Sequence, residues 1–474
     1  MRSGLFLQPG IDGTNMEKTK KVLNTIKPGS IVLLGRDFNG IDSLRNLIRT
    51  IFSFYDKELK IQRPIIAIDQ EGGNVVRIRD LDYLPSNYAL GVLGSQVFAR
   101  YAGNITGHQL REVGIYWNLA PVLDTFSNSD NPIVMERSFG ANPEVVSRLG
   151  EGYIEGIQAA GVAATAKHFP GHGYVREDSH LKLPVDGRGA DSIMNSITPF
   201  KSAIKKDVKS IMMSHIKYEA LDPDFPASMS NKIMSYLRKD LGFQNLIITD
   251  SLDMKAISAN FSVAEFTKSS FSGGADVLEC ADPDLALEIF EHLEKRAEVD
   301  TKQKEERLLR MNIHPSGHTS SPPEVMNWIS VNAIKWIRKK KLDLEKRVFI
   351  VPLRNRGDES SWPFTMYQQL GKKLNDLKIE NEIRYLNDEL KLENANVIFI
   401  GKNLHLSETW KMINELSNSN KCCFVSTGIP VDSSLLNEQV GYISAMSEKL
   451  ESVLASLYSI LGFYDPGEIE GANL

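Results

Sequence analysis

Short apolar runs recur through the first 280 residues, and segments with helical periodicity, such as 41–60, 96–113, 143–160 and 191–206, separate most of them. Strands that are apolar throughout are typical of a parallel sheet buried on both faces. Eight such runs alternating with helices predict an α/β fold, a TIM (β/α)8 barrel over residues 1–283. The runs are Gly4–Leu7, Ile31–Leu34, Ile65–Ile68, Ile115–Leu119, Val162–Ala166, Ser210–Met213, Leu246–Thr249 and Asp276–Glu279.

Polar, titratable residues follow six of these eight runs. In a TIM barrel, catalytic groups lie at the carboxyl ends of several strands, whereas a doubly wound sheet gathers its ligand groups at one switch point. The distribution therefore favours the barrel. The residues are Arg36 and Asp37, Asp69 and Glu71, Asp124, Lys167 and His168, His215, and Asp250.

The remainder of the chain predicts a second, smaller domain. A helical stretch from Asp282 to about Leu308 starts with an aspartate cap and a proline in the first turn. Beyond Arg347 the alternation of apolar runs and helical segments restarts. We therefore expect a helical linker over residues 284–344 and a small α/β three-layer sandwich over residues 345–474. The second domain has no glycine-rich phosphate loop, so a structural or partner-binding role is expected for it.

Composition narrows the class of protein and its partners. The 474 residues are 42% hydrophobic and 24% charged, with a formal net charge of -5, as in a soluble globular protein of two domains. The acidic excess argues against nucleic acid or an anionic membrane as the main partner. The start of the chain is too polar for a signal peptide and no apolar run is long enough to span a membrane, so we expect a cytoplasmic protein. Its three cysteines, Cys280, Cys422 and Cys423, predict reduced core thiols.

The segment from Lys167 to His180 concentrates chemistry within fourteen positions: one lysine, three histidines and Asp178. Its glycines and proline indicate a loop at the end of a buried strand. Imidazole and carboxylate groups are the usual zinc ligands, so a metal site is one interpretation. The spacing, however, matches no helical His-x-x-x-His face and two glycines lie among the candidates. We therefore expect no metal and no cofactor.

The same segment resembles the signature of glycoside hydrolase family 3, in its β-N-acetylglucosaminidase branch. That signature reads K-H-F-P-G-H-G, four variable residues, then D-S-H, and the chain meets every fixed position. Further blocks resemble the family in the same order, with one departure, Arg36-Asp37 where the family often has Arg-Asn. The blocks are Ile66–Gly73, Asn118–Asp124, Asn131-Pro132 with Glu136–Gly140, Met213–His215 and Ile248–Met254.

This resemblance covers nearly all of residues 1–280 and implies a retaining, exo-acting β-N-acetylglucosaminidase. Such an enzyme removes terminal N-acetylglucosamine from small carbohydrate substrates, and the resemblance points to muropeptide-type fragments released during peptidoglycan recycling. A retaining mechanism needs a nucleophilic carboxylate and a proton donor. Asp250 ends the strand 246–249, and the resemblance assigns the nucleophile to it; the alternative is a helix cap.

No second carboxylate lies in an obvious place to donate the proton. Asp178 and His180 are alternate residues of an extended loop, so they can lie on one side and hydrogen-bond, and the imidazole can then give and later take a proton. The resemblance implies the same acid/base pair. Arg137, Lys167, Asp69 and His168 suit sugar hydroxyls, and the resemblance assigns all four to the glucosamine ring.

Three other functions remain open at this stage. A phosphorylase could use the same site, because an imidazole base does not repel an incoming phosphate as a carboxylate would. A catalytically inactive sugar-binding or regulatory module would be expected to lack Asp250 or His180, and both are present. A metal hydrolase is the third.

Overall fold

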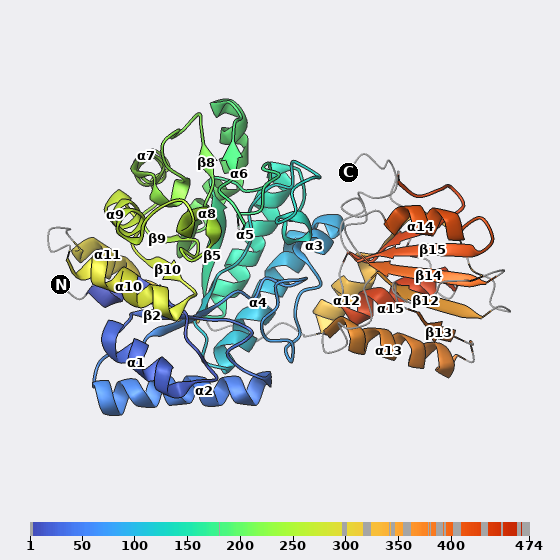
Figure 1. The fold of residues 1–474 in the computed structure, drawn as a ribbon, viewed down its shortest axis with the longest axis horizontal. Helices are drawn as coiled ribbons and strands as arrows, with labels where there is room; N and C mark the ends of the chain where they lie inside the picture. The colour runs from blue at the N-terminus through green and yellow to red at the C-terminus, as the bar shows by residue number, and fades with distance from the viewer. Residues whose placement is uncertain are drawn as a thin grey trace. The chain divides into compact units, whose positions relative to one another are not determined.

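The computed structural model describes residues 3–179, 181–295, 301–315, 324–340, 342, 347–353, 362–377, 379, 381–384, 392, 395–401, 409–427, 435–446, 449–461 and 466. They form two compact units, Met1–Tyr83 with Gly94–Val325, and Leu84–Leu93 with Met326–Leu474 (Figure 1). Within the described residues, no helix is both long and apolar enough to cross a lipid bilayer.

The first unit is built on parallel strands. One sheet has the order β2-β3-β4-β5-β7-β9, and β1 pairs with β10. A bridge between Ile248 and Val277 joins β9 to the segment that enters β10. The prediction of an α/β fold with parallel strands is therefore confirmed. The strands are β1 (Leu7–Pro9), β2 (Ser30–Leu33), β3 (Ile65–Ile68), β4 (Trp117–Asn118), β5 (Ala163–Phe169), β7 (Ser210–Met213), β9 (Leu246–Thr249) and β10 (Leu278–Cys280), with a short parallel pair, β6 (Val185–Asp186) and β8 (Lys217–Tyr218), between the loops.

Helices connect these strands. The first predicted strand differs from the prediction, because residues Ser3–Phe6 form a 3-10 turn and the strand begins at Leu7. The single helix predicted from Asp282 is instead two helices, α10 and α11. The helices of this unit are α1 (Met16–Ile26), α2 (Gly40–Phe54), α4 (Gln96–Glu112), α5 (Pro143–Ala159), α6 (Ala190–Lys205), α7 (Asn231–Ser235), α8 (Lys255–Ser258), α9 (Val263–Gly273), α10 (Pro283–Glu294) and α11 (Lys302–Leu309).

Helices α4 and α5 lie side by side at unusually close range (Figure 1). Glycine makes this possible, since a Cβ at Gly156 would lie 2.0 Å from the carbonyl oxygen of Arg100. The start of α5 follows from its sequence: the Asn142 side chain accepts from the backbone N–H groups of Glu144 and Val145, and a proline occupies the first turn.

The interior between the strands is a cluster of buried apolar side chains, which includes Val32, Ala67, Trp117, Ala163, Met212, Ile248 and Val277. Because successive residues of a strand point to opposite faces, the residue two positions after each of these faces the same interior. This alternation decides which polar residues at the strand ends can meet.

The second unit has a six-stranded sheet of order β11-β16-β15-β14-β12-β13, in which only the β11 and β16 pair is antiparallel. Its two faces carry separate apolar clusters, one with residues of α13 and α15 and the other with Ile413 of α14. The elements are α3 (Asn87–Leu93), α12 (Glu324–Asn332), β11 (Lys335–Arg338), β12 (Val348–Pro352), α13 (Trp362–Asp376), β13 (Asn381–Ile383), β14 (Asn396–Gly401), α14 (Thr409–Leu416), β15 (Lys421–Ser426), β16 (Gly441–Ser444) and α15 (Leu450–Ile460).

A buried ion cluster holds α11 against the strands of the first unit. Asp276 is fully buried and accepts hydrogen bonds from Arg238, from Arg307 of α11 at 2.8 Å and from the backbone N–H of Ile247 at 2.7 Å. One carboxylate thus pairs with two guanidinium groups that carry little solvent exposure. Removing its charge leaves both cations buried without a counter-ion.

Asp276→Asn is therefore expected to lower the free energy of unfolding by about 3–5 kcal/mol, the typical cost of breaking a buried ion pair. Urea denaturation followed by circular dichroism measures it. The matched control is Asp284→Asn, which breaks an ion pair with Lys18 in which Asp284 is 71% exposed and should cost less than about 1 kcal/mol. Equal losses for the two variants would contradict the structural role of Asp276.

Candidate active site

Strand alternation brings three of the predicted site residues to one end of the parallel strands. Asp69 lies two residues after Ala67, and Asp250 lies two residues after Ile248, which both belong to the interior cluster. Lys167 is part of β5 itself. These three residues, with the predicted Arg137 and His168, line one cavity of about 260 Å³.

The cationic side of the cavity is a fixed network of ion pairs. The Nζ atom of Lys167 lies 2.7 Å from Oδ1 of Asp69 and 2.6 Å from Oε1 of Glu71. Arg137 donates two hydrogen bonds to the same Glu71 carboxylate, at 2.8 and 2.9 Å. Although burial alone would raise the pKa of Glu71, Arg137 and Lys167 hold it well below its usual range. The two cations are therefore held in place by a permanently charged partner.

Glu71 follows the third predicted strand, but its position in the sequence predicted no role for it. The signal was present, because Asp69 and Glu71 are alternate residues and both face Lys167. The contact of Glu71 with Arg137, which comes from a separate 3-10 turn at Met135–Arg137, could not be found from spacing.

Asp250 occupies the end of β9 with its carboxylate oriented by the backbone. Its Oδ1 atom accepts from the N–H of Ser251 at 2.8 Å. Although burial would raise its pKa, the nearby His168 and His215 imidazoles and the Ser251 N–H lower the pKa of Asp250 to about 2. An ionised carboxylate at the wall of a cavity can act as a nucleophile at any pH near neutrality. Asp250 does not cap α8, whose N-terminal flank is Met254.

Asp124 organises the loop that carries the histidines. It is fully buried and accepts from the backbone N–H of His168 and His172, and it pairs with Nδ1 of His168 at 2.7 Å. His172 in turn lies 3.1 Å from the Ser179 hydroxyl through Nε2. Burial, with the adjacent His168, lowers the pKa of His172 to about 4, so this imidazole is neutral at neutral pH. His172 is thus a supporting group for the loop.

The predicted acid/base pair, Asp178 and His180, follows His172 in the sequence. His180 is outside the described residues. The structure describes Asp178, whose backbone carbonyl accepts hydrogen bonds from the N–H groups of Leu181 and Lys182. Asp178 does not line the cavity. Ser179, between the two, does line it, and the Ser179 carbonyl accepts from the N–H of Ala256 at 3.2 Å.

Two further carboxylates line the cavity, Asp253 and Glu279. Asp253 accepts from the Ser251 hydroxyl and from the N–H of Ala281 at 2.9 Å, so it braces the loop after Asp250. Glu279 was predicted only as the last residue of a strand. The pattern of one strand cannot show that a glutamate in an apolar run faces the interior.

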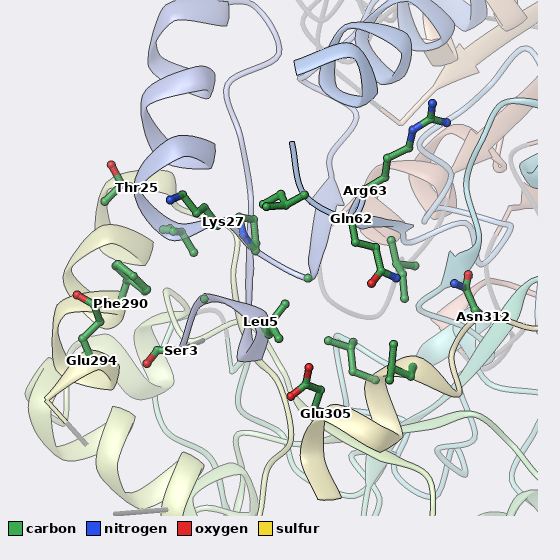
Figure 2. A pocket seen from close by; sticks show the side chains of 18 residues that line it. Ser3, Leu5, Thr25, Lys27, Gln62, Arg63, Phe290, Glu294, Glu305 and Asn312 are labelled. Atoms are coloured by element: carbon green, nitrogen blue, oxygen red, sulfur yellow. The ribbon is translucent and has the colours of Figure 1, made fainter. Parts of the chain in front are cut away.

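A second cavity, of about 430 Å³, lies at the opposite ends of the strands (Figure 2). Leu5 and Gly29 line it just before β1 and β2. The charged residues Lys27, Arg63 and Glu294 that line it are exposed. Because neither Asp250 nor Asp178, the predicted catalytic residues that the structure describes, lines it, we assign the chemistry to the smaller cavity.

Comparisons with known proteins show the family to which the chain belongs. Residues 7–311 match the model of the glycosyl hydrolase family 3 N terminal domain. A "Beta-hexosaminidase" of Thioalkalivibrio sulfidiphilus is 35% identical over 298 residues, which are 60% of this chain and 83% of that protein. A "Beta-hexosaminidase" of Nitrosomonas eutropha is 32% identical over 325 residues, which are 65% of this chain and 91% of that protein. The solved structure of a glycoside hydrolase family 3 beta-N-acetylglucosaminidase from Paenibacillus sp. is similar over 98% of each chain, with a TM-score of 0.88 and 26% identity.

Proposed function

Because the chain belongs to glycoside hydrolase family 3, we propose that it is a retaining, exo-acting β-N-acetylglucosaminidase that removes terminal N-acetylglucosamine. The observation that carries this proposal is the cavity that brings the ionised Asp250 together with Lys167, Arg137 and Asp69. Cleavage with retention requires a nucleophilic carboxylate, and Asp250 supplies one beside charges that suit sugar hydroxyls.

In the proposed mechanism Asp250 attacks the anomeric carbon and the bond to the leaving oxygen breaks, which leaves a covalent glycosyl-enzyme. His180, paired with Asp178, gives its proton to the leaving oxygen. It then takes a proton from water, which attacks the anomeric carbon and releases Asp250. Asp69, Arg137, Lys167 and His168 hold the sugar ring by hydrogen bonds through both steps.

Several finer features belong to the same proposal. The order of the parallel strands, the β9 to β10 bridge and the packing of β1 against β2 support a closed (β/α)8 barrel over residues 1–283. The predicted helical linker over 284–344 contains β11, which pairs with β16, so the predicted three-layer domain over 345–474 would begin earlier than residue 345. The family resemblance supports muropeptide-type fragments as substrates, and the sequence supports a cytoplasmic location.

Two aryl substrates test the proposed function. We expect the aryl N-acetyl-β-glucosaminide to be cleaved with a kcat/KM on the order of 10²-fold above that of the matching β-glucoside, since a site shaped for one substituent discriminates by about this factor. The measurement is release of the aryl alcohol by purified full-length protein. No cleavage of the glucosaminide would overturn the proposal, and formation of a sugar phosphate only when phosphate is added would replace hydrolysis by phosphorolysis.

A further inference from the structure

Glu279 is a buried carboxyl in the catalytic cavity that the mechanism above does not use. It lies in β10, is only 5% exposed and lines the cavity together with Asp69 and Asp250. Its Oε2 atom has no hydrogen-bond partner among the described residues. Buried polar atoms are almost always paired, because leaving one unpaired costs free energy. Oε2 itself is shielded from solvent, so a substrate would meet Glu279 through the part of its carboxyl group that lines the cavity.

The strand pattern aims Glu279 into the space where the sugar is held. Val277 belongs to the interior apolar cluster, and Glu279 lies two residues further along the same strand. Asp69 has the same relation to Ala67, and Asp250 to Ile248. Glu279 therefore holds on β10 the position that the predicted sugar-binding and nucleophilic carboxylates hold on β3 and β9.

The neighbouring strand carries a second unpaired polar side chain at the same level. Gln8 of β1 is the register partner of Glu279 in the parallel pair, so the two side chains point to the same face. Gln8 is fully buried, and neither polar atom of its amide has a partner among the described residues. Gln8 does not line the cavity, so of these two residues only Glu279 can reach a bound sugar.

The surroundings of Glu279 favour the neutral form of its carboxyl group. Burial, followed by the negative charges of Asp69, Asp250 and Asp253, raises the pKa of Glu279 well above its usual range, and Lys167 only partly offsets this. Its register neighbour Gln8 is uncharged. A protonated carboxyl has an O–H donor next to a carbonyl acceptor. It can therefore bind a neutral partner that accepts and donates at one place.

We propose that Glu279 is a specificity-determining residue that hydrogen-bonds one hydroxyl of the sugar ring bound beside Asp250. A hydroxyl fits best because its single oxygen can accept from the acid and donate to it. The acetamido group fits less well, since a trans amide presents its N–H and C=O on opposite sides. This proposal rests on the proposed function, because it takes the cavity as a sugar site.

Glu279 does not suit the role of proton donor. In a retaining glycosidase the donor and the nucleophile act from opposite sides of the scissile bond. Strands β9 and β10 are adjacent, joined by the bridge from Ile248 to Val277, so Glu279 lies on the same side of the cavity as Asp250. Its contribution is to binding, in the ground state and in the transition state.

Deoxy substrates test the proposal. We measure kcat/KM for wild type, Glu279→Leu and Glu279→Gln on an aryl N-acetyl-β-glucosaminide and on its 3-, 4- and 6-deoxy analogues. Glu279→Leu should lower kcat/KM on the parent substrate on the order of 10–10²-fold, as for a lost hydrogen bond to substrate. On the one analogue that lacks the bound hydroxyl, the loss should nearly disappear. Glu279→Gln should retain most activity, because an amide also donates and accepts.

Stability separates this role from a structural one. Leucine removes an unpaired buried polar group, so Glu279→Leu should have a Tm at least equal to that of wild type. The matched control, Glu291→Leu on the exposed face of α10, should change neither Tm nor kcat/KM. A lower Tm with equal loss on all four substrates would overturn the proposal, as would a loss that grows with poorer leaving groups.

Failure of the proposed function gives a different result, since wild type itself would then not cleave the parent substrate. In that case calorimetric binding of N-acetylglucosamine and its deoxy analogues to wild type and Glu279→Leu makes the same comparison without turnover. Weaker binding of N-acetylglucosamine to Glu279→Leu, with no difference on one deoxy analogue, would support the role of Glu279. Equal binding by both proteins would overturn it.

Discussion

Asp250→Asn is expected to lower kcat on an aryl N-acetyl-β-glucosaminide by on the order of 10⁴-fold or more, the range found when a nucleophile is removed. Asparagine has the same shape, but its neutral amide cannot form the ester bond to the anomeric carbon. The Ser251 N–H can still donate to the side-chain oxygen, so the loop should keep its structure. A thermal unfolding scan of the variant provides the control for folding.

Covalent labelling identifies the nucleophile independently of the variant. A 2-fluoro glycoside should trap the glycosyl-enzyme on Asp250 of the wild type, and peptide mapping by mass spectrometry locates it. The label on Asp253 or on Asp69 would contradict the assignment. Asp253 is a useful comparison because it lines the same cavity but already binds the Ser251 hydroxyl and the Ala281 N–H.

The charge state of Asp250 also limits the pH profile. Its pKa is lowered from the usual 3.8 to about 2, so the carboxylate stays ionised at every pH above about 4. A lowered pKa stabilises the folded state above the unfolded value, and this stabilisation is lost as the pH falls through the folded value. An acidic limb of kcat/KM above about pH 4 must therefore come from another group.

Much of this site could be predicted because several of its residues lie at the ends of strands whose apolar pattern is visible in the sequence. Asp69 and Asp250 directly follow apolar runs, and alternation decides that they face one interior. Lys167 was predicted from the same pattern. Glu279 was not, because a carboxyl inside a short strand gives no sign of its face until the register with Gln8 and the interior position of Val277 are known.

Contacts between segments that are distant in the chain could not be predicted from the sequence, for a different reason. The pairing of Arg137 with Glu71 joins residues 66 positions apart. Helix α3 is another case: residues 84–93 lie in the chain between β3 and β4, yet they group with the second unit, where the Ser86 hydroxyl donates to the carbonyl of Met446. No periodic pattern encodes such contacts, since they depend on how whole elements pack.

His180→Gly should give a defect that depends on the leaving group, if His180 is the acid/base. On substrates with poor leaving groups the first step should slow on the order of 10²–10⁴-fold, the usual contribution of general acid catalysis. An activated aryl group departs with little protonation, so its first step should suffer far less. The Ser179 residue next to His180 lines the cavity, and its contacts with His172 and Ala256 hold this part of the loop there.

The second step supplies the stronger test of the same residue. Without a base to activate water, the glycosyl-enzyme on Asp250 should accumulate, and a burst of the aryl alcohol should precede slow turnover. Azide needs no base, so it should attack the anomeric carbon, release Asp250 and yield a β-glycosyl azide. Asp178→Ala should give a weaker form of this defect, with the pH optimum moved to lower values, because the imidazole loses the partner that holds its proton. If His180→Gly is impaired equally on all leaving groups and azide restores nothing, the proton donor is another residue.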